Sequence, residues 1–126
     1  MSKILVTGAS GFVGQHLIKA CACEHGIAEL FKHNSTVSDI TRADSLDSYL
    51  NKNIDVVVHL AGKTFVPASW QQPTEFFNVN QNGTLNVLEF CRKENARIIY
   101  VSSYLYGNAS LPTSELDPIQ VNNPYS

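Results

Sequence analysis

The stretch Thr7-Gly8-Ala9-Ser10-Gly11-Phe12-Val13-Gly14 decides the fold of this chain. Before it lies the apolar run Lys3-Ile4-Leu5-Val6-Thr7, which predicts a buried strand that ends at the first glycine. After it, apolar side chains recur four residues apart, at Val13, Leu17 and Cys21, which predicts a helix over residues 12–23. The stretch is therefore the turn of a strand–turn–helix unit at the start of the chain.

The three glycines of this turn, Gly8, Gly11 and Gly14, have the spacing Gly-x-x-Gly-x-x-Gly. In such a turn the first glycine permits a tight reversal, the second lets a phosphate approach the backbone, and the third lets the helix press against the strand. The exposed N–H groups and the positive end of the helix dipole then favour a bound anion. Between a strand and a helix, this spacing is a variant of the dinucleotide-binding fingerprint, so we expect it to hold a pyrophosphate.

The rest of the chain alternates short apolar runs with longer amphipathic segments. We expect strands at residues 27–31, 36–37, 55–60 and 97–101, helices at residues 43–50 and 74–94, and a loop from residue 106 onward. Gly83 lies inside the last helix, where glycine costs about 1 kcal/mol relative to alanine, so we expect a close packing partner beside it. Apolar strands separated by helices imply a parallel sheet covered on both faces, and right-handed crossovers make it a doubly wound α/β domain.

Composition excludes several classes of protein. With 126 residues, 44% of them hydrophobic, and a net charge of −2, the chain has the make-up of one globular domain. Nine Lys and Arg against eleven Asp and Glu leave no basic field for nucleic acid or anionic lipid. The apolar runs are shorter than the about 20 residues of a membrane-spanning helix, and the N-terminal run is too short for a signal peptide, so we expect a cytoplasmic protein without membrane contact. The cysteines and histidines show no ligand spacing, so we expect no metal site.

The end of the second predicted strand bears on which dinucleotide is bound. In this kind of fold, a carboxylate about 20 residues beyond the glycines accepts a hydrogen bond from the ribose 2′-OH of NAD. The segment Phe31-Lys32-His33-Asn34 carries no acid, and Glu29 lies too early, within the strand. Lys32 or His33 would instead attract the 2′-phosphate of NADP, although two solvated basic residues explain the same sequence. Both NAD and NADP stay open, with a slight preference for NADP.

Six motifs occur along the chain in a fixed order. They are Thr7-Gly8-Ala9-Ser10-Gly11-Phe12-Val13-Gly14, Ser38-Asp39-Ile40, His59-Leu60-Ala61-Gly62, Asn80-Gln81-Asn82-Gly83-Thr84, Val101-Ser102-Ser103-Tyr104-Leu105-Tyr106-Gly107 and Asn123-Pro124-Tyr125. With them, the chain resembles the N-terminal part of the extended short-chain dehydrogenase/reductase family, the NAD(P)-dependent nucleotide-sugar epimerases and dehydratases. The resemblance implies a Rossmann-like NAD(P)-binding domain over residues 1–126 that is incomplete at its C-terminus, before the last strands and the substrate domain.

The resemblance implies a cofactor site made of several segments. The pyrophosphate would lie along Gly8, Gly11, Phe12, Val13 and Gly14; the adenine amino group would donate to Asp39, with Ile40 beside the ring; Leu60, Ala61 and Gly62 would pass under the cofactor; and Asn80 would brace the loop near the nicotinamide. Two of these residues have simpler alternatives, because Asp39 also suits a helix N-cap and Asn80 a bond to the backbone. His59 ends a strand, and we expect it to be a packed structural residue, not a base.

The resemblance also implies a catalytic Ser or Thr, a Tyr and a Lys. The first falls on Ser102, with Ser103 as the alternative, and its hydroxyl would bond the substrate oxygen. Tyr125 matches the tyrosine that exchanges a proton with the substrate while hydride moves to or from the nicotinamide. Ser103 and Tyr104 occupy the places of the acidic pair of the dehydratases, which favours epimerisation or carbonyl reduction of a nucleotide sugar.

The family's lysine lies one helical turn after the tyrosine, whereas the sequence given ends at Ser126. An unperturbed tyrosine has a pKa of about 10, so without a nearby cation it is a weak base at pH 7. We therefore expect this chain alone to bind the dinucleotide without turning over a substrate. The alternatives are a non-catalytic module whose NAD(P) occupancy is sensed by a partner and a fragment without function. An open sheet edge beside residues 97–101 would favour self-association.

Overall fold

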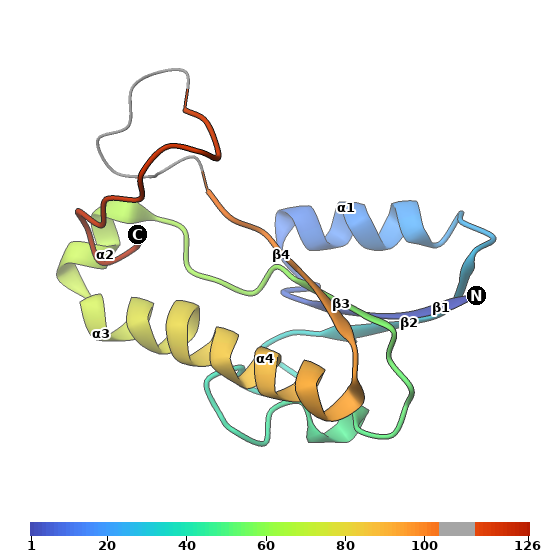
Figure 1. The fold of residues 1–126 in the computed structure, drawn as a ribbon. Coiled ribbons are helices and arrows are strands. Elements are labelled where there is room, and N and C mark those ends of the chain that lie inside the picture. The colour runs from blue at the N-terminus through green and yellow to red at the C-terminus, as the bar shows by residue number, and fades with distance from the viewer. Residues whose placement is uncertain (104–112) are drawn as a thin grey trace.

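The computed structural model describes residues 1–103 and 113–126, and its centre is a parallel sheet. The strands are β1 (Ser2–Thr7), β2 (Ile27–His33), β3 (Val56–His59) and β4 (Arg97–Tyr100). They lie in the order β2-β1-β3-β4, and every neighbouring pair is parallel (Figure 1). The doubly wound α/β class predicted from the alternation of apolar runs is confirmed. The predicted loop from residue 106 begins outside the described residues, as do Tyr104, Tyr106 and Gly107 of the fifth motif.

Helices cover both faces of the sheet. Helix α1 (Phe12–Cys21) lies on one face and helix α4 (Gly83–Glu94) on the other (Figure 1). This arrangement explains why the central strands β1 and β3 are largely apolar, because both of their faces are covered, whereas the edge strands β2 and β4 keep several exposed residues. Between the sheet and α4 lies a cluster of buried side chains from Leu5, Ile40, Leu46, Ile54, Val57, Val87, Phe90 and Cys91.

The strand register places four residues in one row at the carboxyl ends of the strands. Thr7 lies opposite His33 on one side and His59 on the other, and His59 lies opposite Tyr100. The chain leaves β1 for β2 on one side and continues later to β3 on the other. The end of β1 is therefore the topological switch point of the sheet, where open α/β folds bind their ligands.

The segment between β2 and β3 differs from the prediction. Residues 36–37 form no strand, because Asn34 Oδ1 accepts from the N–H groups of Thr36 (3.0 Å) and Val37 (3.3 Å) and so closes a turn. Residues 43–50 form turns and one short 3-10 helix (η1, Asp47–Tyr49) instead of an α-helix. Their backbone bonds run from residue i+3 to residue i, a pattern favoured where Ser, Thr and Asp compete for the backbone.

The predicted helix over residues 74–94 is divided into three parts. Helix α3 (Pro73–Phe76) leads into a π-helical segment η2 (Phe77–Asn82), which continues as α4. A further short helix, α2 (Val66–Gln71), precedes them and was not predicted. A π-segment has no clear sequence signature, although such segments are frequent at functional sites.

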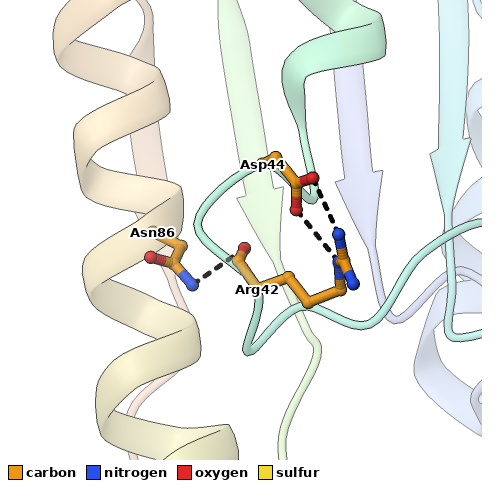
Figure 2. A network of polar contacts seen from close by, with 3 residues as sticks. All are labelled: Arg42, Asp44 and Asn86. Atoms are coloured by element: carbon orange, nitrogen blue, oxygen red, sulfur yellow. Dashed lines mark hydrogen bonds and ion pairs between the residues drawn. The ribbon is translucent and has the colours of Figure 1, made fainter.

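The close partner expected beside Gly83 is Ile40. A Cβ built on Gly83 would lie 3.0 Å from Ile40 Cγ2, so only a glycine leaves the observed space. The loop that carries Ile40 is also tied to α4 by Asn86, whose Nδ2 donates to the carbonyls of Ile40 (2.9 Å) and Arg42 (3.1 Å). Figure 2 shows Asn86 reaching the Arg42 carbonyl, while the Arg42 guanidinium makes a two-bond ion pair with Asp44 (3.0 and 2.8 Å). These contacts fix the loop that precedes η1.

Candidate functional site

The glycine turn lies directly against the loop that follows β3. Gly8 has φ +66°, in the left-handed region, and a Cβ built on it would lie 2.7 Å from both Ala61 N and Leu60 C. A Cβ on Gly14 would overlap the Gly8 carbonyl, and this close approach seats α1 on the turn. Gly11 N–H donates to the Gly8 carbonyl (3.0 Å) and closes the reversal. Gly8 therefore makes the tight turn that the spacing predicts, whereas Gly14 lets the helix approach the turn at Gly8 and Ala9, where the spacing predicted contact with the strand.

The start of α1 is open to an anion. No side chain among the described residues caps this helix, and its first turn carries no acidic residue. Phe12 and Val13 in that turn are 81% and 59% exposed. Backbone N–H groups at the start of a ten-residue helix carry a partial positive charge, which here faces the switch point of the sheet. This end of the helix can accept a phosphate without displacing a protein group.

A cavity of about 390 Å³ brings most of the remaining predicted residues together. Its lining includes Val13, Leu60, Ala61, Gly62, Asn80, Ser102 and Tyr125. The two predicted catalytic residues, far apart in the sequence, thus border the same space as the glycine-turn helix and the loop after β3. The lining also contains Lys63, Thr84 and Tyr100, which the sequence did not single out. Ser103, the alternative to Ser102, borders the cavity as well.

Asn80 braces the loop after β3 with both ends of its amide. Its Oδ1 accepts from the Lys63 N–H (2.8 Å), and its Nδ2 donates to the Lys63 carbonyl (3.0 Å). A Cβ on Gly62 would lie 3.3 Å from Asn80 Oδ1, so the small residue leaves room for this contact. Asn80 belongs to the π-segment η2, which presents the amide to the loop. The bracing of the loop is as expected, whereas a role near the nicotinamide stays a prediction.

The Lys63 side chain is held on the same wall of the cavity. Its ammonium forms an ion pair with Glu75 and lies 5.7 Å from the centre of the Phe76 ring. These contacts direct a positive charge toward the α3 side of the site. A basic residue at this place has no recognisable motif in the sequence.

The residues predicted to meet the adenosine half of the dinucleotide lie at the carboxyl end of β2 and in the loop that follows it. Asp39 is exposed and uses Oδ1 to accept from the Thr41 N–H and hydroxyl, both at 2.9 Å, and these bonds lower the pKa of its carboxyl. Among the described residues, its Oδ2 has no partner and is available to a donor. Asp39 thus caps a turn, and the expectation that it caps a helix is wrong, because the next helix along the chain, η1, begins only at Asp47. The Oδ2 atom of Asp39 can still meet an adenine amino group. Ile40 is buried against Gly83.

The two basic residues at the end of β2 have opposite environments. Lys32 is exposed, whereas the His33 side chain is 1% exposed and packs edge-on to Tyr49 with ring centres 5.8 Å apart. Burial lowers the pKa of His33, and neither ring nitrogen has a hydrogen-bond partner within the described part of the chain. The expectation that His33 meets a 2′-phosphate is therefore wrong for the ring as it lies here, because the neighbouring side chains cover it. Lys32 alone of the pair can reach such a group.

His59 is the structural residue that the sequence suggested. Its side chain is 3% exposed, and burial lowers its pKa from 6.5 to about 4. The ring is therefore neutral at pH 7.

Within the described residues, no group of three or more His, Cys, Asp and Glu side chains could bind a metal ion. No helix in that part of the chain is long and apolar enough to cross a bilayer.

A glycine turn at the switch point of a doubly wound sheet, an open helix start and an adjoining cavity define a nucleotide-binding α/β domain. The sequence profile of the NAD dependent epimerase/dehydratase family matches residues 4–126. The chain therefore belongs to this family, as its motifs suggested.

Several characterised proteins are similar to the chain over nearly all of its length. GDP-6-deoxy-D-mannose reductase of Pseudomonas aeruginosa is 35% identical over 98% of this chain and 42% of its own length. UDP-glucose 4-epimerase of Halalkalibacterium halodurans is 32% identical over 97% of this chain and 41% of its own length. The structure of RMD from Pseudomonas aeruginosa complexed with NADPH has a TM-score of 0.83 at 34% identity, over 99% of this chain and 44% of that one. The chain thus spans less than half the length of these relatives.

Proposed function

We propose that the chain binds NAD or NADP along the carboxyl edge of the sheet, with the pyrophosphate at the glycine turn and the start of α1. The observation that carries this proposal is the open start of α1 at the switch point, which forms part of the stretch Gly8–Gly14 and borders, through Val13, the same cavity as Ser102 and Tyr125. Backbone N–H groups and the helix dipole supply the attraction for two phosphates. Gly8 and Gly14 remove the side chains that would fill the space between turn, helix and loop.

The adenosine half of the dinucleotide lies, in this proposal, beside Asp39 and the end of β2. The free Oδ2 of Asp39 accepts from the adenine amino group. Lys32 is exposed at the end of β2, where no carboxylate is present to receive a ribose 2′-OH. This charge supports the slight preference for NADP, whereas the similar solved structures include complexes with NADPH, with NADP and with NAD and do not choose between the cofactors. Lys32→Glu should weaken NADPH binding more than NADH binding if the preference holds.

For the whole protein we propose the epimerisation or carbonyl reduction of a nucleotide sugar, the chemistry named for its relatives. The bound dinucleotide would supply or accept the hydride. The Ser102 hydroxyl donates a hydrogen bond to the substrate oxygen, and Tyr125 exchanges the proton that this oxygen gains or loses. Both residues line the same cavity as the loop after β3, so a sugar bound in this cavity would lie beside the proposed cofactor site. In this chain alone we expect binding of the dinucleotide without turnover.

A charge introduced at the start of α1 tests the proposed phosphate site. Phe12→Glu adds a carboxylate where the pyrophosphate is expected, and the same charge suits the helix dipole by about 0.3–1 kcal/mol. We therefore expect unchanged or slightly higher stability but at least tenfold weaker dinucleotide binding, measured by calorimetric titration. Phe12→Gln is the matched control, because it has the same shape without the charge and removes the same exposed ring. Equal affinities for the Glu and Gln variants would overturn the placement of the pyrophosphate.

We also propose that the edge strand β4 promotes self-association. Among the described residues β4 pairs with β3 alone, and Ile99, Tyr100 and Val101 are each more than half exposed. An apolar strand edge of this kind invites pairing with another chain. Light scattering should show a mass that rises with concentration, and a monomer at high concentration would count against the proposal.

A further inference from the structure

The His59 ring lies between two threonine hydroxyls at the core of the site. Thr7 Oγ1 is 2.7 Å from His59 Nδ1, and Thr84 Oγ1 is 3.0 Å from His59 Nε2. Thr7 is fully buried, and His59 nearly so. The three residues come from β1, β3 and α4, so the contacts join both strands to the helix that covers them. Each ring nitrogen has one partner, and the direction of each bond follows from what else the hydroxyl binds.

At the first end, the lone pairs of the Thr7 hydroxyl are occupied. The N–H groups of Leu60 and Ala61 both donate to Thr7 Oγ1 at 3.2 Å, and the Leu60 N–H is shared with the Thr7 carbonyl at 3.3 Å. A hydroxyl has two lone pairs and one proton, so with both lone pairs accepting, its proton is left to donate. The acceptor within reach is His59 Nδ1, which must therefore be unprotonated.

Thr84, on the other side of the His59 ring, indicates the same tautomer independently. Thr84 Oγ1 lies 2.6 Å from the Asn80 carbonyl, which can only accept, so the Thr84 proton goes there. The Thr84 oxygen then accepts from His59, and Nε2 must carry the proton. Burial lowers the pKa of His59 to about 4, which agrees with a single proton on the ring at pH 7. Both threonines thus select the Nε2–H tautomer.

We propose that Thr7, His59 and Thr84 form a chain of hydrogen bonds, called the relay below, that holds the Leu60–Ala61 peptide in position against the glycine turn. The relay begins at the N–H groups of Leu60 and Ala61 and ends at the carbonyl of Asn80. That peptide is the one a Cβ on Gly8 would strike, so the relay sets the distance between the glycine turn and the loop that is expected to pass under the cofactor.

The other end of the loop is held by the π-segment η2, which continues as α4. The Asn80 amide clamps the backbone of Lys63, so the loop from Leu60 to Lys63 is fixed at both ends. His59 is thus a positioning residue, with no part in proton transfer. Its effect on cofactor affinity rests on the proposed function, whereas its tautomer and its hold on the loop do not.

The tautomer is measured directly by NMR on the unaltered chain with 15N-labelled histidine at pH 7. Nε2 should resonate as a protonated nitrogen and Nδ1 as an unprotonated one, without any nucleotide present. The exposed His25 serves as an internal reference. A protonated Nδ1, or a mixture of tautomers at His59, would overturn the relay.

Amide exchange tests the hold on the loop. Thr7→Val removes the hydroxyl at nearly constant shape, and the Ala61 amide should exchange about tenfold faster, as for one lost buried hydrogen bond. The Leu60 amide keeps its bond to the Thr7 carbonyl and should change less. Thr7→Ser keeps the hydroxyl and should restore protection, while Thr74→Val, at an exposed position in α3, is the matched control. Unchanged exchange in Thr7→Val would contradict the proposal.

A dinucleotide titration of the same variants links the relay to the site. Affinity should fall several-fold in Thr7→Val and recover in Thr7→Ser. If the unaltered chain binds no dinucleotide, the proposed function fails, while the tautomer and exchange results still decide the relay. Should Thr7→Val not fold, the tautomer measurement on the unaltered chain decides it alone.

Discussion

Gly8→Ala should lower the free energy of unfolding of this domain far more than a glycine-to-alanine change at an open position. The backbone at Gly8 has φ +66°, and a left-handed conformation costs a residue with a Cβ about 1–2 kcal/mol. The added carbon would also lie 2.7 Å from backbone atoms of Leu60 and Ala61. Backbone cannot move aside as the end of a side chain can, and overpacking of this kind costs about 1–3 kcal/mol. Together we expect a loss of about 3 kcal/mol.

Gly26→Ala provides the matched control, because a Cβ there meets no atom within 4 Å. Its φ is not in the left-handed region, so the change should be neutral or slightly stabilising through the unfolded chain. Urea unfolding followed by circular dichroism compares the midpoints of both variants with that of the unaltered chain, provided that the denaturant dependence of the unfolding free energy is equal. Equal midpoints for the two variants would refute the reasoning, since the close approach of the two loops would then carry no energetic weight.

Three further changes test other contacts. His59 should make the domain less stable as the pH falls from 6.5 to about 4, because the unfolded chain binds a proton that the folded chain rejects. The pKa of about 4 sets an upper limit of about 3 kcal/mol on this loss of stability. Urea titrations at pH 7 and pH 4.5 measure the loss, and His59→Gln should reduce it. Gly83→Ala should destabilise by about 1 kcal/mol despite the better helix propensity, because the new methyl meets Ile40 Cγ2 at 3.0 Å, and a rise in the melting temperature would contradict this contact. Asn95→Gly should stabilise by about 0.5 kcal/mol, since this residue ends α4 in the left-handed region at φ 55°, and a lower melting temperature would show that the Asn side chain matters there.

Sequence predicted the parts of the fold that local pattern determines. The strands followed from apolar runs, and the spacing of Gly8 and Gly14 predicted a close approach that the structure shows. The partner of Gly83 could be anticipated only as a close neighbour, because Ile40 lies far away in the chain. Local signals suffice where a residue's role depends on its own backbone, and they fail where the role depends on what packs beside it.

The site shows the same limit. The burial of His33 depends on Tyr49, which lies in a segment whose turns the sequence misjudged as a helix. The clamp of Asn80 on Lys63 needs the π-segment, which the periodicity of the chain does not reveal. The relay through His59 joins residues more than fifty positions apart in the case of Thr7. The resemblance predicted that Asn80 braces this loop, but its partner Lys63, like the partners of His33 and His59, follows from tertiary contacts that only the folded structure makes visible.

The central claim, that this chain holds a nicotinamide dinucleotide at the glycine turn, is tested most directly by thermal unfolding in the presence of NADPH, NADH and ATP. A ligand that binds the folded chain stabilises it by about 2.7 kcal/mol at a hundredfold excess over its Kd. We predict a cooperative transition that NADPH or NADH raises well beyond the effect of ATP, with the larger shift for NADPH. No shift with either dinucleotide would contradict the claim.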